Sequence, residues 1–237
     1  RIAKWAVCCG YKDAECLMHL VACVTLRNGC AFTHLEALVS DEISAMGFAV
    51  QKSPEVVSLD LQQCLSTAAD RLDGIRPDLI GETFLIRVVV GPKTRSEIKR
   101  YAIIARALAG ADDAVITVLV RTAQDLAAGS ADHPSVKWLR QTIQDSANIE
   151  RLVRMANALP ESTLALREIA CEIYIRMVEL RREVKDESEE NRNRLAISLN
   201  NLYVRLRDLV RDEAALIAAA EALNLLRALV VECPDTF

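Results

Sequence analysis

Apolar residues recur every three or four positions along most of this sequence, which is the spacing of helices that bury one face. Turn and cap residues divide the pattern, with Asn28-Gly29 and Gly110-Ala111 as stops and Ser53-Pro54 as a start. The segments predict helices over residues 11–27, 33–45, 54–69, 95–109, 111–127, 134–146, 148–158, 161–184, 194–209 and 212–231, and a further apolar segment over 78–90. Because the connections are short, we expect antiparallel helix pairs stacked in order as an α-solenoid.

Two local signals refine this pattern. Thr33 and Glu36 have the spacing of a capping box, which predicts a helix start at Thr33. Asp73-Gly74 is a tight-turn signal and allows a short strand pair at residues 72–77. Aromatic residues are only 4% of the chain, and Gly and Pro are few, whereas sheets favour aromatic side chains and need turn residues. We therefore predict an all-α fold with at most this small hairpin.

The chain carries 33 acidic and 29 basic residues, a net charge of −4, which makes a nucleic-acid partner unlikely on electrostatic grounds. A membrane-spanning helix needs roughly 20 apolar residues. The uncharged stretch Leu17–Leu26 covers ten, so we expect no membrane segment. The most highly charged stretch, residues 181–194, admits two interpretations: an acidic patch for a basic partner, or a solvated loop between helices. Charges of both signs flank it, which favours the loop.

Eight cysteines are present, and four of them are seven residues apart: Cys9, Cys16, Cys23 and Cys30. On a helix this spacing puts Cys16 and Cys23 on one face, which admits a metal or redox stripe or, alternatively, small apolar core side chains. No Cys-x-x-Cys occurs, and neither His19 nor His34 lies at a matching ligand spacing, so we favour the core interpretation. Scattered cysteines in a chain of this size predict a reducing, cytoplasmic location.

No segment has the spacing of a familiar catalytic or nucleotide-binding motif. Gly91-Pro92-Lys93-Thr94 is nearest to a P-loop, but it lacks the first glycine of that motif, and Pro92 has no N–H to offer a phosphate. The three histidines, His19, His34 and His133, stand apart from one another. We therefore predict no catalytic, cofactor-binding or metal-ligating residues, no ATP binding by this chain, and no enzymatic activity.

The end of the chain resembles a tetratricopeptide repeat. An offset of 33 residues superposes the apolar positions of 166–173 on those of 199–206, and residues 195–237 resemble the longer repeat of kinesin light chains. In this resemblance the small residues Ala215, Ala219 and Ala222 let the second helix approach an apolar ridge of the first, namely Leu199, Leu202 and Leu206. Two residues depart from the pattern: Val210 stands where the turn commonly has Gly, and Tyr203 where a small residue is usual.

A second resemblance concerns Ile75-Arg76-Pro77-Asp78-Leu79-Ile80-Gly81-Glu82-Thr83-Phe84. It is similar to a stretch that follows the ATPase module in bacterial STAND-type signalling NTPases, and residues 159–168 are similar to the lead into their repeats. In that family a winged-helix module, helical connectors and tetratricopeptide repeats follow the NTPase. The resemblance thus implies a winged-helix-like module at 1–90, a helical connector at 91–160 and tetratricopeptide-like repeats at 161–237, with the native protein continuing beyond them.

By this resemblance the chain is a non-catalytic regulatory and sensor region that binds a protein or peptide partner through its repeats, with self-association as a further expectation. One alternative is a stand-alone helical-repeat scaffold, and another is a winged-helix transcription regulator. The acidic charge disfavours the regulator, because Arg71, Arg76 and Arg87 are few for reading a DNA groove. A P-loop encoded upstream would favour the NTPase over the scaffold.

Two residues are predicted to contact the partner. In tetratricopeptide repeats the first helix of each pair lines the concave surface. Asn201 and Arg205 lie four apart on that helix, so their side chains project together. An amide offers donors and an acceptor to an extended backbone. The alternative is that Asn200 and Asn201 bond to adjacent loops or helix ends and serve the scaffold.

Overall fold

The computed structural model describes residues 2–12, 14–65, 67–76, 78–160, 163–184 and 188–232. Within these residues the fold is all-α, as predicted, and three two-residue strands are its β structure. The elements in chain order are α1 (Ile2–Cys8), α2 (Glu15–Leu26), β1 (Cys30–Ala31), α3 (Phe32–Met46), α4 (Pro54–Cys64), β2 (Thr67–Ala68), β3 (Arg71–Leu72), α5 (Asp78–Val90), α6 (Glu97–Leu126), α7 (Pro134–Gln144), α8 (Ile149–Ala158), α9 (Arg167–Glu183), α10 (Glu189–Asp208) and α11 (Asp212–Glu232).

Packing divides the chain into two compact units, residues 1–126 and residues 127–237. The first holds α1 to α6 and the strands, and the second holds α7 to α11. The boundaries expected at residues 90 and 160 each fall inside one of these units. The centre of the charged stretch, residues 185–187, lies outside the described residues.

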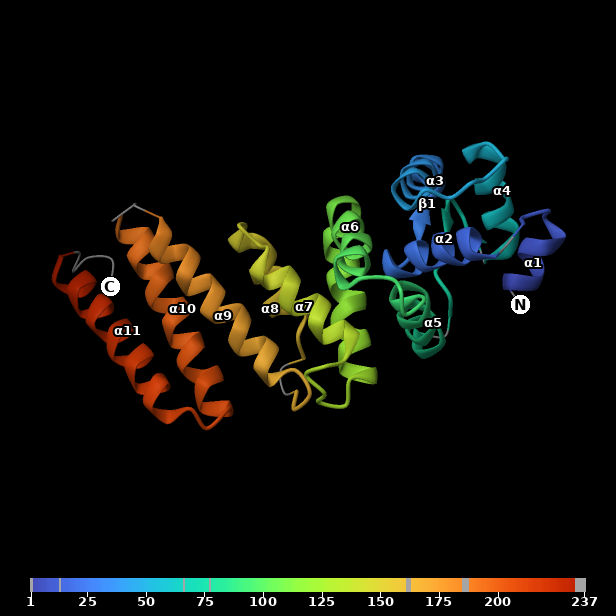
Figure 1. The fold of residues 1–237 in the computed structure, drawn as a ribbon. Helices are drawn as coiled ribbons and strands as arrows, with labels where there is room; N and C mark the ends of the chain where they lie inside the picture. Colours follow the sequence, from blue (N-terminus) through green and yellow to red (C-terminus); the bar gives the residue numbers. More distant parts are fainter. Residues whose placement is uncertain are drawn as a thin grey trace. The chain divides into compact units, whose positions relative to one another are not determined.

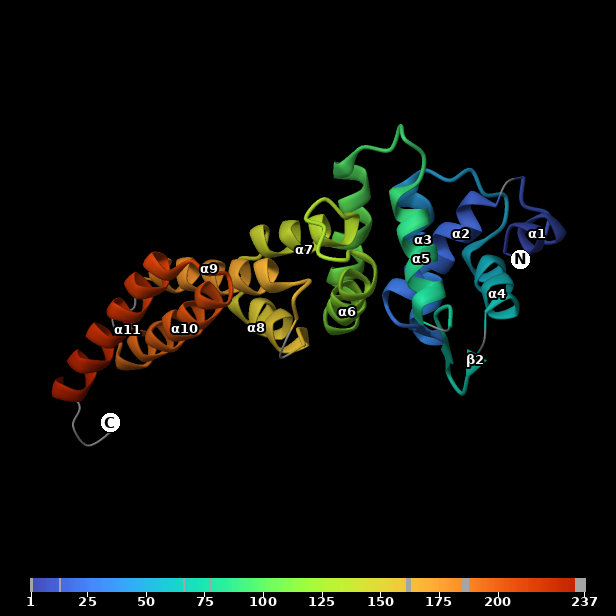
Figure 2. The same cartoon turned by 90° about the horizontal axis from the view of Figure 1, so that it is seen from below.

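In the first unit a small antiparallel sheet joins helices that surround α2. β3 pairs with β1 on one side and with β2 on the other, so the strand order is β1–β3–β2. Ten of the twelve residues of α2 are buried, and this helix contacts α1, α3, α5 and α6. Figure 2 shows α5 running alongside it. Cys16 and Cys23 are among its buried residues, and none of the described cysteines forms a disulfide.

The hairpin lies earlier in the sequence than the predicted residues 72–77. β2 and β3 enclose a turn at Ala69-Asp70, where Ala69 has φ of 49°. Asp73-Gly74 follows β3, and a Cβ on Gly74 would lie 2.9 Å from the Cα of Thr25. Gly74 therefore allows the chain to approach α2 closely and does not form the turn of the hairpin. The strand pair predicted around Asp73-Gly74 was misplaced because the glycine was read as a turn residue.

The capping box predicted from Thr33 and Glu36 is wrong. α3 begins one residue earlier, at Phe32, and its N-cap residue Ala31 makes no side-chain cap hydrogen bond. The backbone N–H of Phe32 instead donates to the carbonyl of Asp70 in the hairpin turn, at 2.9 Å. A tertiary contact with the hairpin turn thus accompanies the start of α3 in place of the predicted local capping.

Other local signals predicted the breaks correctly. The hydroxyl of Ser53 accepts from the N–H of Val56 at the start of α4. Ala111 leaves the helical conformation inside α6, with φ of −159°, so the expected break after Gly110 appears as a kink.

The helix predicted over 11–27 begins only at Glu15. Tyr11 lies before it, and its hydroxyl donates to Asp60 at 2.8 Å.

The second unit is a series of helices in which α9 contacts α7, α8 and α10, and α10 packs along α11. Both views show α9, α10 and α11 side by side (Figures 1 and 2). The core between these three helices consists of Cys171, Val178, Leu199, Leu202, Leu206, Ala215, Ala218 and Ala222. Ala218, and not the expected Ala219, is buried with the other two alanines, because α11 turns that face toward α10.

Val210 occupies the turn between α10 and α11 in the left-handed region, with φ of 57°. Left-handed backbone costs an L-residue about 1–2 kcal/mol, and a β-branched side chain suits it least. The side chain of Val210 is 80% exposed, so removing it loses few packing contacts. Glycine, which has no Cβ, would adopt this conformation without that cost.

We expect Val210→Gly to raise the free energy of unfolding by about 1 kcal/mol, measured by urea titration. The matched control is Val204→Gly, on the exposed face inside α10. There the backbone is helical and glycine should destabilise by up to about 1 kcal/mol. If Val210→Gly and Val204→Gly changed the free energy of unfolding in the same direction, the assignment of backbone strain to Val210 would be contradicted.

By length and composition α11 could cross a membrane: its most apolar stretch has a mean hydropathy of 1.8. Within the described residues it is the one helix that meets this test, which was not anticipated from the sequence. Core helices of soluble proteins, which are mostly buried, also meet it. The apolar stretch of α11 is 22% buried, and Ala215, Ala218 and Ala222 are the residues that it packs against α10. The finding is weak evidence for a membrane span.

Candidate functional site

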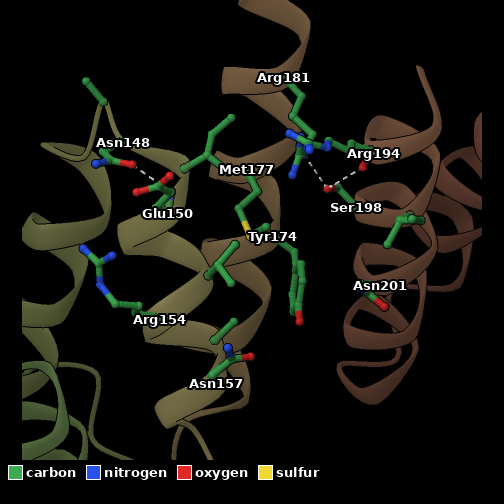
Figure 3. A pocket seen from close by; sticks show the side chains of 15 residues that line it. Asn148, Glu150, Arg154, Asn157, Tyr174, Met177, Arg181, Arg194, Ser198 and Asn201 are labelled. Carbon is green, nitrogen blue, oxygen red and sulfur yellow. Dashed lines mark hydrogen bonds between the residues drawn. The ribbon is translucent and has the colours of Figure 1, made fainter. Parts of the chain in front are cut away.

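A hollow of about 990 Å³ lies between α8 and α10, with α9 as its floor (Figure 3). Tyr174 and Met177 line the floor, Asn157 comes from α8, and Ser198 and Asn201 come from α10. A second hollow, of about 600 Å³, continues along α9, because both are lined by Ala156, Asn157 and Tyr174. We call the two together the α9 groove.

The walls of the α9 groove are fixed by helix caps and by burial of the opposite helix faces. The side chain of Asn148 accepts from the N–H of Glu150 at 2.8 Å and starts α8, whose residues Leu152 and Met155 are buried. Ser188 caps α10 in the same way, accepting from the N–H of Asn191. Since the leucine ridge of α10 is buried in the core with α11, the next face of α10 is left to line the groove.

A polar network occupies one end of the groove. Arg181 donates from Nε to Ser198 Oγ at 2.9 Å, and Ser198 in turn donates to the backbone carbonyl of Arg194 at 3.0 Å. Arg194 also pairs with Glu190 one turn earlier. Burial and the neighbouring charge of Arg194 lower the pKa of Arg181 below its ordinary value. Two cationic side chains thus lie at this end of the groove, and the neutral hydroxyl of Ser198 links the guanidinium of Arg181 to the backbone of Arg194.

Both residues predicted to contact a partner line the α9 groove. Asn201 faces the larger hollow and is half-buried, and its side chain has no hydrogen-bond partner among the described residues. Arg205 faces the smaller hollow and is 3.4 Å from Asp208 on the same helix. The alternative role was that Asn200 and Asn201 bond to adjacent loops or helix ends, and the side chain of Asn201 makes no such bond among the described residues. The lining from α8 and α9, including Asn157 and Arg181, was not identified from the sequence, where nothing links these segments.

A second polar cluster lies buried in the first unit. Nε2 of His19, on α2, is 2.9 Å from Glu42 Oε2 on α3, and Arg106 on α6 donates to both carboxylate oxygens, at 3.1 and 2.7 Å. Although burial alone raises the pKa of Glu42, the hydrogen bonds from His19 and Arg106 lower it to about 2. The sequence separations of 23 and 64 residues give no local signal for this cluster.

The same cluster brings three metal-ligand types together, since atoms of His19, Cys23 and Glu42 lie within 4.8 Å of one another. Metal sites need the thiolate form of Cys, whereas burial raises the pKa of Cys23 above its usual range. A cation here would also replace Arg106 on the carboxylate. The arrangement therefore suits a structural clasp between α2, α3 and α6 better than a metal centre.

The remaining sequence candidates have local roles. Gly91 ends α5 with φ of 58°, and Arg95 folds back to donate to the carbonyl of Val88 at 2.6 Å. The segment that came nearest to a P-loop is thus a turn after a helix. His133 lies 2.7 Å from the hydroxyl of Ser135 at the start of α7, and burial lowers its pKa.

Comparison with protein-family models, with curated proteins and with solved structures found no match for this chain.

Proposed function

We propose that this chain is the non-catalytic regulatory region of a STAND-type signalling NTPase and that it binds a protein partner in the α9 groove. The observation that carries the proposal is the combination of two features in one chain: the strand order β1–β3–β2 in the first unit, and an open groove along a helix series in the second. The first feature is suited to relay a nucleotide-dependent change and the second to bind a trigger protein.

The first unit supports the winged-helix-like part of the proposal. Winged-helix modules run helix, strand, two helices and two strands, with the first strand beside the last. The order α2, β1, α3, α4, β2, β3 and the pairing of β1 with β3 agree with this arrangement. The stretch that resembled the signalling NTPases follows it directly and forms the start of α5, where Asp78 and Glu82 both pair with Arg121 of α6.

A DNA-reading role is less well supported. α4 would be the recognition helix, and it contains Glu55 and Asp60 but no Lys or Arg. Its exposed face includes Val56 and Leu59, at 41% and 56% exposure. Since phosphate contacts need Lys or Arg, this face suits a protein surface better than a nucleic acid.

The proposal predicts that Asn201→Ala with Arg205→Ala weakens partner binding roughly tenfold, which is about 1.4 kcal/mol, and leaves the melting temperature nearly unchanged. Both side chains line the groove and neither is part of the core of the second unit. The probe is a short peptide selected by the wild-type chain from a random-sequence library, with binding measured by fluorescence anisotropy.

The matched control is the pair Asn224→Ala and Arg227→Ala, exposed on α11 and outside the groove. It removes the same two side-chain types and should bind the peptide like the wild type. If the groove variant unfolds early while each folded molecule still binds normally, these residues serve the scaffold and the proposal fails.

A stand-alone helical-repeat scaffold is the second candidate, and the compactness of residues 127–237 as a unit of their own favours it. The gene upstream of this segment separates the two. A Gly-x-x-x-x-Gly-Lys-Ser/Thr motif followed by an ATPase module supports the signalling NTPase, and its absence from the complete reading frame supports the scaffold.

A further inference from the structure

We propose that the α9 groove binds an extended acidic peptide, one carboxylate of which is held between Arg181 and Arg194. This inference rests on the proposed function of the groove and specifies the chemistry of its ligand.

The charge of the groove is opposite to that of the chain. Its lining includes five arginines, at positions 154, 167, 181, 194 and 205, against two carboxylates, Glu150 and Asp208. The chain as a whole has more acidic than basic residues. A local excess of arginine on an acidic protein favours an acidic ligand over a generally basic or neutral one.

Arg181 and Arg194 are the pair best arranged to hold a carboxylate. Both side chains line the same end of the larger hollow (Figure 3), and they are close enough for the charge of Arg194 to act on Arg181. The hydrogen bond of Arg181 goes to the neutral hydroxyl of Ser198, and no ion pair joins it to a carboxylate in the described parts of the chain. The terminal nitrogens of a guanidinium form the planar fork that binds a carboxylate in a bidentate manner.

The electrostatics of the pair support the same assignment. The pKa of Arg181 is lowered first by burial and then by the charge of Arg194. An anion between the two groups would relieve this repulsion and stabilise both charges. Glu190 offsets part of the charge of Arg194 from the solvent side, but it is exposed and does not line either hollow.

The rest of the groove favours an extended backbone. Asn157 and Asn201 come from opposite walls and offer amide donors and acceptors. A helical ligand uses its backbone N–H and C=O groups internally, whereas an extended peptide leaves them for such side chains. Tyr174 on the floor belongs to both hollows, so a peptide that follows α9 can pass along both.

The test compares two libraries of short random-sequence peptides on arrays, one containing Asp and Glu and the other with Asn and Gln in their places. The proteins are the wild-type chain, Arg181→Gln with Arg194→Gln, and a control of equal net charge, Arg207→Gln with Arg227→Gln, whose residues lie outside the groove. We expect the wild type and the control to prefer the acidic library. The groove variant should bind acidic peptides at least tenfold more weakly, since it loses the charge-assisted hydrogen bonds to the ligand carboxylate.

The outcomes separate this inference from the proposed function. One outcome overturns the inference and leaves the proposed function standing. In it the wild type binds peptides without preferring acidic sequences, and the variant Asn201→Ala with Arg205→Ala loses this binding. The same holds if the Arg181 and Arg194 variant keeps the acidic preference. Binding of a random-sequence single-stranded RNA in place of peptides overturns the inference. Absence of any peptide binding by the wild type overturns both.

Discussion

Replacing Glu42 by Gln is expected to lower the free energy of unfolding by about 3 kcal/mol, because it leaves the cation Arg106 without its partner at a buried site. Glu42 is 1% exposed and accepts hydrogen bonds from His19 and Arg106, and so joins three helices of the first unit. Urea unfolding followed by circular dichroism measures the effect. The control is Asp41→Asn, which changes an exposed carboxylate one position earlier on α3 and should alter stability little.

The effect of Glu42→Gln is expected to depend on pH. The pKa of Glu42 in the folded chain is about 2, below its ordinary value of 4.5. A depressed pKa contributes stability that is complete above the unfolded pKa and is lost as the pH falls through the folded pKa. The stability difference between wild type and variant should therefore be largest above pH 4.5 and shrink as the pH approaches 2. A difference that does not change across this window would show that the carboxylate charge is not what stabilises the cluster.

Replacing Gly81 by Ala is expected to destabilise the chain by about 1–3 kcal/mol, although alanine is the better helix former. Gly81 lies in α5, and a Cβ there would be 2.6 Å from the carbonyl oxygen of Ile75 and 3.2 Å from Cγ2 of Thr25. The first of these atoms belongs to the backbone, so it cannot move aside cheaply. α5 would have to shift away from the backbone at Ile75, just before it in the chain, and from Thr25 of α2.

The matched control for Gly81→Ala is Gly110→Ala in α6. There the nearest atoms to a new Cβ are 3.7 Å away and belong to the flexible side chain of Arg27, an ordinary van der Waals contact. Thermal unfolding should show Gly110→Ala neutral or stabilised by up to about 1 kcal/mol. Equal effects of the two substitutions would contradict the close packing of Gly81 against Ile75 and Thr25.

The sequence predicted what depends on local chemistry. Ser53-Pro54 and Gly110 act through their own backbone and nearest neighbours, and their helix start and break are where the pattern indicated. The same logic explains Val210, whose departure from the repeat pattern corresponds to a left-handed backbone. Tertiary contacts overrode such signals elsewhere. The start of α3 is set by Asp70 and not by Thr33, and Gly74 is needed for contact with Thr25 and not for a turn.

The groove and the buried clasp show the limit of sequence reasoning more clearly. Asn201 and Arg205 could be chosen because they share one helix face at a spacing of four. Arg181 and Asn157 come from two other helices, and only packing brings them to the same hollow. The contact between Glu42 and Arg106 joins residues 64 apart. A single sequence gives no periodicity from which such pairings can be inferred.

Nuclear magnetic resonance of the side-chain amides is the sharpest test of the proposal that the α9 groove binds a protein segment. A peptide selected by the wild-type chain is added to the labelled protein. We expect the side-chain amide signals of Asn157 and Asn201, which line the groove from opposite walls, to shift on binding. The signals of Asn28, in the first unit, and Asn224, on the exposed face of α11, should stay in place. A bound peptide that leaves Asn157 and Asn201 unshifted would contradict the claim.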